Sequence, residues 1–141
     1  MGLLLAVSAS WAAAQSHEVR VGDIVLRSST VASDRIDPAT ASRHGIEPSP
    51  HRGVLNVVVL SDEGKAQKTL LAKVSAFTRN LAGVRTDIDL REVKENDRVS
   101  YMGTYEFAPR EVLDFRIEAR PAGIQMKEPL TLEYRERMWA R

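Results

Sequence analysis

Apolar and polar residues alternate along much of the second half of the chain. In the stretch 113–120, Leu113 and Phe115 fall on one side of an extended backbone, while the charged residues between them fall on the other. This two-residue period indicates a β-strand with one buried face and one solvated face. The stretches 99–107 and 130–135 repeat the pattern. We therefore predict half-buried strands throughout this region.

The middle of the chain contains a different kind of strand. Residues 54–60 read VLNVVVL, an almost continuous apolar run rich in β-branched valine, which is typical of a central strand covered on both faces. Asn56 interrupts the run, and a buried carboxamide without a partner costs about 1 to 3 kcal/mol. We expect Asn56 to tie a neighbouring loop, that of Arg52, to the sheet; lining a ligand pocket is the alternative. Further strands are predicted over 69–81 and 86–94.

Strands also begin the domain, and turns separate the later ones. Residues 17–21 and 24–28 flank the pair Gly22-Asp23 and are expected to form a single bent edge strand. Later connections carry Gly, Pro, Asn and Asp at intervals of about ten to twenty residues. Short strands at this spacing predict an all-β sandwich or barrel. Because no repeat or linker divides it, the segment 15–141 is expected to form one domain.

One segment has the pattern of a helix. Asp37 can cap a helix that begins at Pro38, where the missing N–H of proline costs nothing, and Gly45 can end it. The spacing predicts a helix of barely two turns.

The chain starts with the layout of a secretory signal peptide. Residues 1–14 hold an apolar stretch at 3–7 and three alanines at 12–14, before the first charge at Glu18. Small residues before the cut are what a signal peptidase accepts. We predict cleavage after Ala14 and export to the periplasm or the medium. The alternative, an amphipathic N-terminal helix, lacks an apolar stripe at a spacing of 3.6 residues.

Composition narrows the classes of function. Lys and Arg number 20 against 19 Asp and Glu, and the resulting net charge of +1 supplies no field that would favour nucleic acid as a partner. No apolar run is long enough to span a bilayer, so we expect no membrane insertion. The chain has no cysteine, which excludes disulfides, thiol catalysis and thiolate metal sites.

Several short motifs are spread over the chain: Gly22-Asp23, Pro38 to Ile46, the run Arg52-Gly53-Val54-Leu55-Asn56-Val57 after His51, Asn80-Leu81, Arg91-Glu92-Val93 and Tyr101. Taken together, they resemble the small proteobacterial family called domain of unknown function 4426, over roughly 19–139. The resemblance implies an exported, immunoglobulin-like antiparallel β-sandwich of about seven strands, with one short helix after the first strand. It implies no activity.

A metal site would form if the peptidase cuts after Ala14. The new terminus would read Gln15-Ser16-His17. A free amine, two deprotonated amides and the imidazole of His17 can hold Cu(II) or Ni(II) in the square plane that these ions favour. Otherwise no cofactor is expected. Cu(II) or Ni(II) binding through His17 is therefore the alternative function.

No spacing in the chain points to catalysis. Nucleophile signatures such as Gly-x-Ser-x-Gly are absent from the sequence. Asp87 and Asp89 alternate with Ile88 and Leu90, which places the carboxylates on a solvated strand face rather than across a cleft suited to glycoside hydrolysis. The charged residues of the last strands are expected to form cross-strand pairs that keep an exposed sheet face soluble. We therefore expect a protein that is not an enzyme.

The longest departure from a strand pattern runs from Ser28 to Arg52. Long loops on a β-sandwich are where binding usually resides. We predict a non-enzymatic interaction module with a protein partner that docks on this loop or on a sheet edge. The candidate contact residues are Arg35, Arg43, His44, His51 and Arg52.

Overall fold

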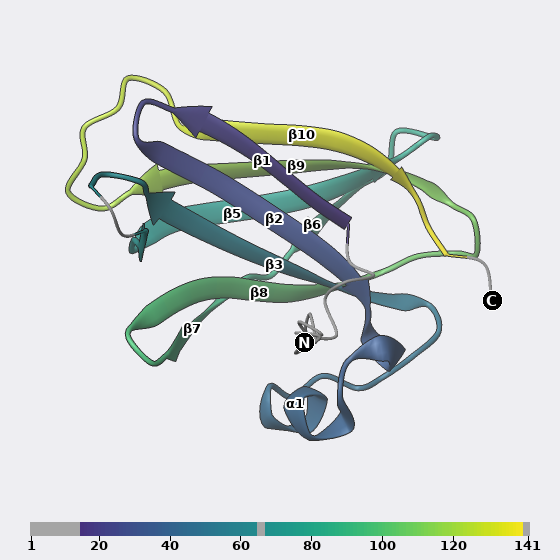
Figure 1. The fold of residues 1–141 in the computed structure, drawn as a ribbon. Helices are drawn as coiled ribbons and strands as arrows, with labels where there is room; N and C mark the ends of the chain where they lie inside the picture. The colour runs from purple at the N-terminus through teal and green to yellow at the C-terminus, as the bar shows by residue number, and fades with distance from the viewer. Residues whose placement is uncertain (1–14, 65–66, 140–141) are drawn as a thin grey trace, which may run out of the picture.

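Two antiparallel sheets packed face to face make up the structure, a computed structural model that describes residues 15–64 and 67–139 (Figure 1). The predicted all-β sandwich is confirmed. The predicted signal peptide, residues 1–14, lies outside the described residues. Within the described ranges, no helix is long and apolar enough to cross a membrane.

The larger sheet, called sheet A, has six strands in the order β1-β2-β3-β8-β7, with β4 pairing with the far end of β3. All of its pairings are antiparallel. Its strands are β1 (Gln15–Val21), β2 (Ile24–Ala32), β3 (Arg52–Ser61), β4 (Lys68–Thr69), β7 (Arg91–Glu95) and β8 (Arg98–Glu106).

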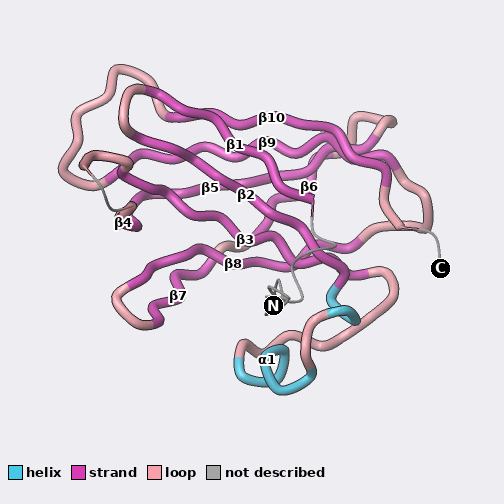
Figure 2. Tube along the Cα trace, in the orientation of Figure 1, coloured by secondary structure: helices cyan, strands magenta, loops and turns pink. Residues whose placement is uncertain are grey.

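The smaller sheet, called sheet B, has four strands in the order β10-β9-β5-β6. It lies across the core from β2, β3 and β8 (Figures 1 and 2). Its strands are β5 (Ala72–Asn80), β6 (Arg85–Ile88), β9 (Val112–Pro121) and β10 (Leu130–Arg137).

The core between the sheets is built from the alternation that the sequence shows. Phe115 and Ile117 of β9 and Leu26 and Leu55 of sheet A are at most 1% exposed. Full burial of each such side chain contributes about 1.5 to 3 kcal/mol before conformational entropy is subtracted. The tyrosine ring of Tyr105 packs edge-on against Phe115, with centroids 5.2 Å apart, and closes the core between β8 and β9.

The expected bent edge strand at the start of the domain is instead a hairpin. Val21 of β1 pairs with Ile24 of β2, and the two-residue turn between them places Gly22 at a φ of +59°. A tight turn with positive φ reverses the chain, whereas a bend would have continued it. This reversal adds a strand, so the helix follows the second strand rather than the first. In all, the described residues form ten strands rather than about seven.

The expected strands over 69–81 and 86–94 are each divided. The first is interrupted between β4 and β5, and the second between β6 and β7, so each moves from one sheet to the other. The second crossing passes close over β8 because Gly103 has no side chain there. A Cβ on Gly103 would lie 2.4 Å from the carbonyl oxygen of Asp89. Hydrophobic alternation does not reveal such a crossing, because the alternating pattern continues unchanged from the strand in one sheet to the strand in the other.

The short helix forms as predicted. Helix α1 (Pro38–Arg43) begins after Asp37, whose carboxylate accepts a hydrogen bond from the backbone N–H of Thr40 at 3.2 Å. Gly45 follows the helix with a φ of +68°, a conformation in which glycine is favoured. A 3₁₀ turn, η2 (Ser33–Arg35), precedes it.

The role expected for Asn56 is wrong. Its side chain lies on the outer face of sheet A, half-buried, and its Oδ1 atom has no hydrogen-bond partner among the described residues. The Arg52 side chain instead bonds to Glu106 on the neighbouring strand and to the backbone of Glu47. Asn56 therefore does not tie the loop of Arg52 to the sheet.

Candidate functional site

The excursion between β2 and β3, residues 33–51, packs against sheet A through a small apolar core. It lies at one end of the sandwich, below sheet A in the view of Figure 1. Hydrogen bonds between the ends of the excursion hold it closed, because the Ser33 hydroxyl donates to the Ser49 carbonyl at 3.0 Å and accepts from the Ser49 N–H at 2.9 Å. The excursion is thus an ordered platform. The apolar core combines residues of the excursion with residues of sheet A: Ile36, Ala41 and Ile46 from the excursion, and Val31, Val54 and Met102 from the sheet, with Val93 packed against them.

The structure divides the predicted contact residues into separate groups. Arg43 and His44 both approach Glu95 at the end of β7, at 3.9 and 3.5 Å. His51 lies edge-on to Phe107, with ring centroids 6.5 Å apart, and its side chain is exposed. Arg35 is exposed on the 3₁₀ turn.

Arg52 has a structural role. Its Nε donates to Glu106 at 2.6 Å and its Nη1 donates to the carbonyl oxygen of Glu47 at 2.5 Å. These bonds join the excursion to strand β8 and leave the Arg52 side chain only 25% exposed. A partner could reach Arg35, Arg43 and His51 more readily.

His17 lies at the seam where β1 of sheet A meets β10 of sheet B. Its Nε2 lies 3.0 Å from the Glu136 carboxylate, and its ring stacks on Tyr134 with centroids 3.8 Å apart. The Thr30 hydroxyl donates to the other carboxylate oxygen at 3.1 Å. Glu136 faces inward and its side chain is only 8% exposed, so these bonds satisfy a carboxylate that is almost removed from water.

Two tyrosines complete this seam. Burial raises the pKa of Tyr105 far above its usual range, and the charge of Glu136 adds to the shift. Burial likewise raises the pKa of Tyr134, although a hydrogen bond from the Ser28 hydroxyl at 2.9 Å partly opposes it. Both phenols therefore stay neutral at any physiological pH. The Tyr105 hydroxyl is buried without a hydrogen-bond partner among the described residues.

Sequence reasoning missed the seam, although a signal was present. Glu136 follows Leu130, Leu132 and Tyr134 at the same two-residue period, so it falls on the buried face of its strand. A carboxylate in an apolar register predicts an inward-facing acid with partners. The identity of those partners depended on the pairing of β1 with β2, which the expected bent strand did not provide.

The pairing of β1 with β2 determines whether the backbone amide of His17 is available to a metal. Val21 and Ile24 flank a two-residue turn, so they form a hydrogen-bonded pair, and every second pair along the ladder does the same. By this alternation the backbone N–H of His17 points to Ser28. A square-planar site would have to remove that amide proton and lift the start of β1 from β2. No cluster of three or more His, Asp or Glu side chains suited to a metal occurs within 15–64 and 67–139.

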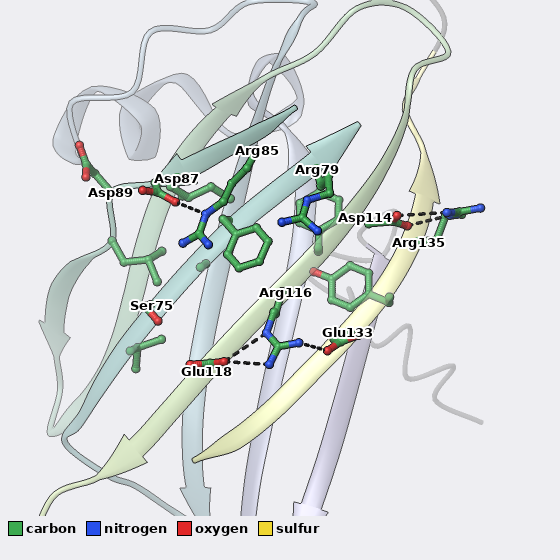
Figure 3. A pocket seen from close by; sticks show the side chains of 17 residues that line it. Ser75, Arg79, Arg85, Asp87, Asp89, Asp114, Arg116, Glu118, Glu133 and Arg135 are labelled. Carbon is green, nitrogen blue, oxygen red and sulfur yellow. Dashed lines mark hydrogen bonds and ion pairs between the residues drawn. The ribbon is translucent and has the colours of Figure 1, made fainter. Parts of the chain in front are cut away.

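A broad hollow of about 1000 Å³ lies on the outer face and open edge of sheet B (Figure 3). Asp114 and Arg135 form two hydrogen bonds across β9 and β10, at 2.7 and 3.1 Å. The bond to Arg135 lowers the pKa of the Asp114 carboxyl. Arg116 bonds to both Glu118 and Glu133. The predicted cross-strand charge pairs are therefore confirmed on this face.

At the β5–β6 end of the same face, two arginines surround one aromatic ring. The Arg85 guanidinium lies 3.8 Å from the centroid of Phe77 and that of Arg79 lies 5.5 Å from it. Beyond them, Leu81 and Val84 at the hairpin tip are 68% and 57% exposed. Sequence reasoning missed this tip, because a pair of aliphatic residues beside a turn has the same pattern whether it is covered or bare.

The family follows from a match over nearly the whole domain. Residues 18–140 match the family model described as Domain of unknown function (DUF4426). The chain belongs to this family. Among curated proteins, none matches.

Solved structures show the same fold. The chain is similar to a DUF4426 family protein, PA0388, from Pseudomonas aeruginosa, with a TM-score of 0.74 and 24% identity over 89% of this chain and 96% of that one. It is also similar to FetP from a uropathogenic Escherichia coli, expressed in the periplasm, with a TM-score of 0.64 and 13% identity over 89% and 95% of the two chains. A copper-bound variant of FetP matches with a TM-score of 0.63 and 13% identity, over 88% of this chain and 95% of that one.

Proposed function

We propose that this chain is an exported, non-enzymatic interaction module of the periplasm, and that a protein partner docks on the excursion 33–51. The observation that carries the proposal is the order of that excursion. It packs on sheet A through a shared apolar core, and it has a capped helix and hydrogen-bonded ends, yet it leaves Arg35, Arg43 and His51 exposed. Basic groups on a preorganised platform lose little conformational entropy when a partner binds.

Two observations support the location. The first 14 residues have the pattern of a leader whose removal would leave Gln15, the first residue of β1. FetP, which has a similar fold, was expressed in the periplasm. Intact mass of the protein recovered from a periplasmic extract tests this part, and a product that still begins at Met1 would contradict it.

The partner surface is tested by crosslinking in cells followed by pulldown. We expect Arg35→Glu combined with Arg43→Glu to lose the crosslinked partner, because both changes reverse charge on exposed side chains that do not hold the fold. Lys127→Glu is the matched control, since Lys127 is exposed in the β9–β10 loop at the other end of the sandwich. A partner retained by the double variant, or lost equally from the control, would contradict the proposal.

Binding of Cu(II) or Ni(II) through Gln15-Ser16-His17 is the alternative. In its favour, the His17 side chain is 32% exposed and its ring is already oriented by Glu136. Because the His17 amide belongs to the β-ladder, we expect no square-planar absorbance band from the folded protein with one equivalent of copper. A synthetic peptide with the same free terminus should give the band. A band in the folded protein that His17→Ala abolishes would establish the alternative instead.

A further inference from the structure

Strand β6 is an edge of sheet B with an open outer side. It pairs with β5 from Arg85 to Ile88, and none of the residues in 15–64 and 67–139 pairs with its other side. An uncovered edge presents unpaired backbone groups and is a template for another strand.

The pairing with β5 determines which residues of β6 face outward. The carbonyl oxygen of Val84 accepts a hydrogen bond from the N–H of Asn80 at 3.1 Å. Hydrogen bonding alternates along an antiparallel strand, so Val84 and Thr86 direct their backbone groups toward β5. Arg85 and Asp87 therefore direct an N–H and a C=O each toward the open side.

The side chains on this edge are complementary to themselves. Arg85 and Asp87 both lie on the outer face of sheet B, where they bond to each other at 2.9 Å (Figure 3). In an antiparallel pairing centred on Thr86, Arg85 would lie opposite Asp87 of a second copy, and Asp87 opposite its Arg85. A two-fold axis through Thr86 thus places opposite charges together twice. Arg85 and Asp87 of the second copy would also form the hydrogen-bonded backbone pairs, because both residues direct their N–H and C=O groups toward the open side.

The inner face of β6 is uncovered at the centre of the strand. Thr86 lies on the same side of β6 as Ile88, which is buried in the core, and yet Thr86 is exposed. Sheet A therefore does not cover β6 at its centre. Val84 and Leu81, among the most exposed large apolar residues described, flank the same edge at 57% and 68% exposure. Covering such a pair favours association.

The edge strand β7 offers an instructive contrast. Glu92 and Lys94 also alternate in charge and form an ion pair at 3.6 Å. However, no large hydrophobic residue of β7 is among the exposed ones, and its end at Glu95 is already contacted by the excursion. Charge alternation is shared by both edges, whereas exposed apolar side chains occur beside β6.

From these observations we infer that β6 pairs antiparallel with β6 of a second copy of this chain. The pairing joins the two four-stranded sheets into one continuous sheet across a two-fold axis. It uses a different surface from the excursion 33–51, so it does not depend on the proposed function.

Sedimentation equilibrium of the purified chain over a dilution series tests the inference. Wild type should show a reversible monomer–dimer equilibrium. Arg85→Asp and Asp87→Arg each place like charges opposite one another twice, so each should weaken dimerisation at least about tenfold. A mixture of the two variants restores opposite charges and should recover the dimer as a heterodimer. The double variant Arg85→Asp, Asp87→Arg should recover it alone.

Control variants distinguish a loss of dimerisation through β6 from a loss of folding. Lys94→Glu makes a charge reversal on β7 and should leave dimerisation unchanged. Asp87→Pro removes an N–H on the open side only, so it should weaken the dimer while β5–β6 pairing remains. Thermal unfolding identifies any variant that fails to fold. In that case, recovery of the dimer by the mixture and by the double variant tests the pairing. A wild type that is monomeric at every soluble concentration, an equal effect of Lys94→Glu, or no recovery on mixing would overturn the inference.

Discussion

The two sides of this sandwich differ in whether their strand edges are covered. On one side, the edges of β1 and β10 face each other. There Glu136 of β10 bonds across the seam to His17 of β1 and to Thr30 of the neighbouring strand β2. On the other side, the chain crosses between the sheets at Asp89 and leaves the outer edge of β6 open. Side-chain chemistry closes one side, whereas the open side keeps backbone groups that a further strand can use. The difference indicates where stability resides and where association is possible.

The largest expected effect concerns the closed side. Phe115 stacks on Tyr134 at 5.0 Å between centroids, and Tyr134 stacks on His17. Phe115→Ala would remove the buried end of this stack, so we expect it to lower the free energy of unfolding by about 3 to 5 kcal/mol. Urea denaturation measures the change. A loss below about 1 kcal/mol would show that the stack contributes little to the closed side.

A second test removes the polar link of the seam. Glu136→Ala would leave the buried Thr30 hydroxyl and the His17 ring without their partner. We expect a loss of about 1 to 3 kcal/mol in urea denaturation. Glu133→Ala on the exposed face of the same strand is the control and should cost less. Equal losses would mean that the seam has no special role.

The open side should behave differently. In the monomer Asp87 is 72% exposed and bonds to Arg85 on its own strand. We therefore expect Asp87→Arg to change the free energy of unfolding of the dilute monomer by less than about 0.5 kcal/mol. A substantially larger loss under dilute conditions would show that the ion pair holds the fold rather than being available to a second copy.

The smallest effect concerns the exposed charge ladder of sheet B. Hydrogen bonding from Arg135 lowers the pKa of the Asp114 carboxyl below its usual value of 3.8. A carboxyl with a lowered folded-state pKa stabilises the fold above its unfolded-state pKa, and this contribution is lost as the pH falls through the folded-state value. Arg135→Met should therefore raise the Asp114 pKa in a carboxyl titration followed by NMR. An unchanged pKa would show that the pair does not persist in solution.

The sequence predicted what depends on local pattern. The alternation around Phe115 located β9, and Asp37 and Gly45 located the helix ends, because burial period and capping act over a few residues. It failed where long-range geometry decides. The crossing at Asp89 depends on the bare backbone of Gly103, and the partners of Glu136 depend on a turn far away in the chain.

The candidate site shows the same limit. Arg43 and His44 were identified correctly as part of a long excursion, but their approach to Glu95 depends on how the excursion folds over β7. Arg52 looked like a contact residue because it is basic and close to the loop. Its bonds to Glu106 and Glu47 show that a charged side chain at a loop end can serve the scaffold.

Backbone hydrogen exchange, followed residue by residue in dilute and concentrated solutions, tests the difference between the two sides most directly. The N–H of Thr86 faces β5 and should be protected at every concentration. The N–H groups of Arg85 and Asp87 face the open side, so they should exchange rapidly when dilute and become protected as the concentration rises. Exchange at Arg85 and Asp87 that stays equally fast at all concentrations, or equally slow even when dilute, would contradict an open edge that a second copy occupies.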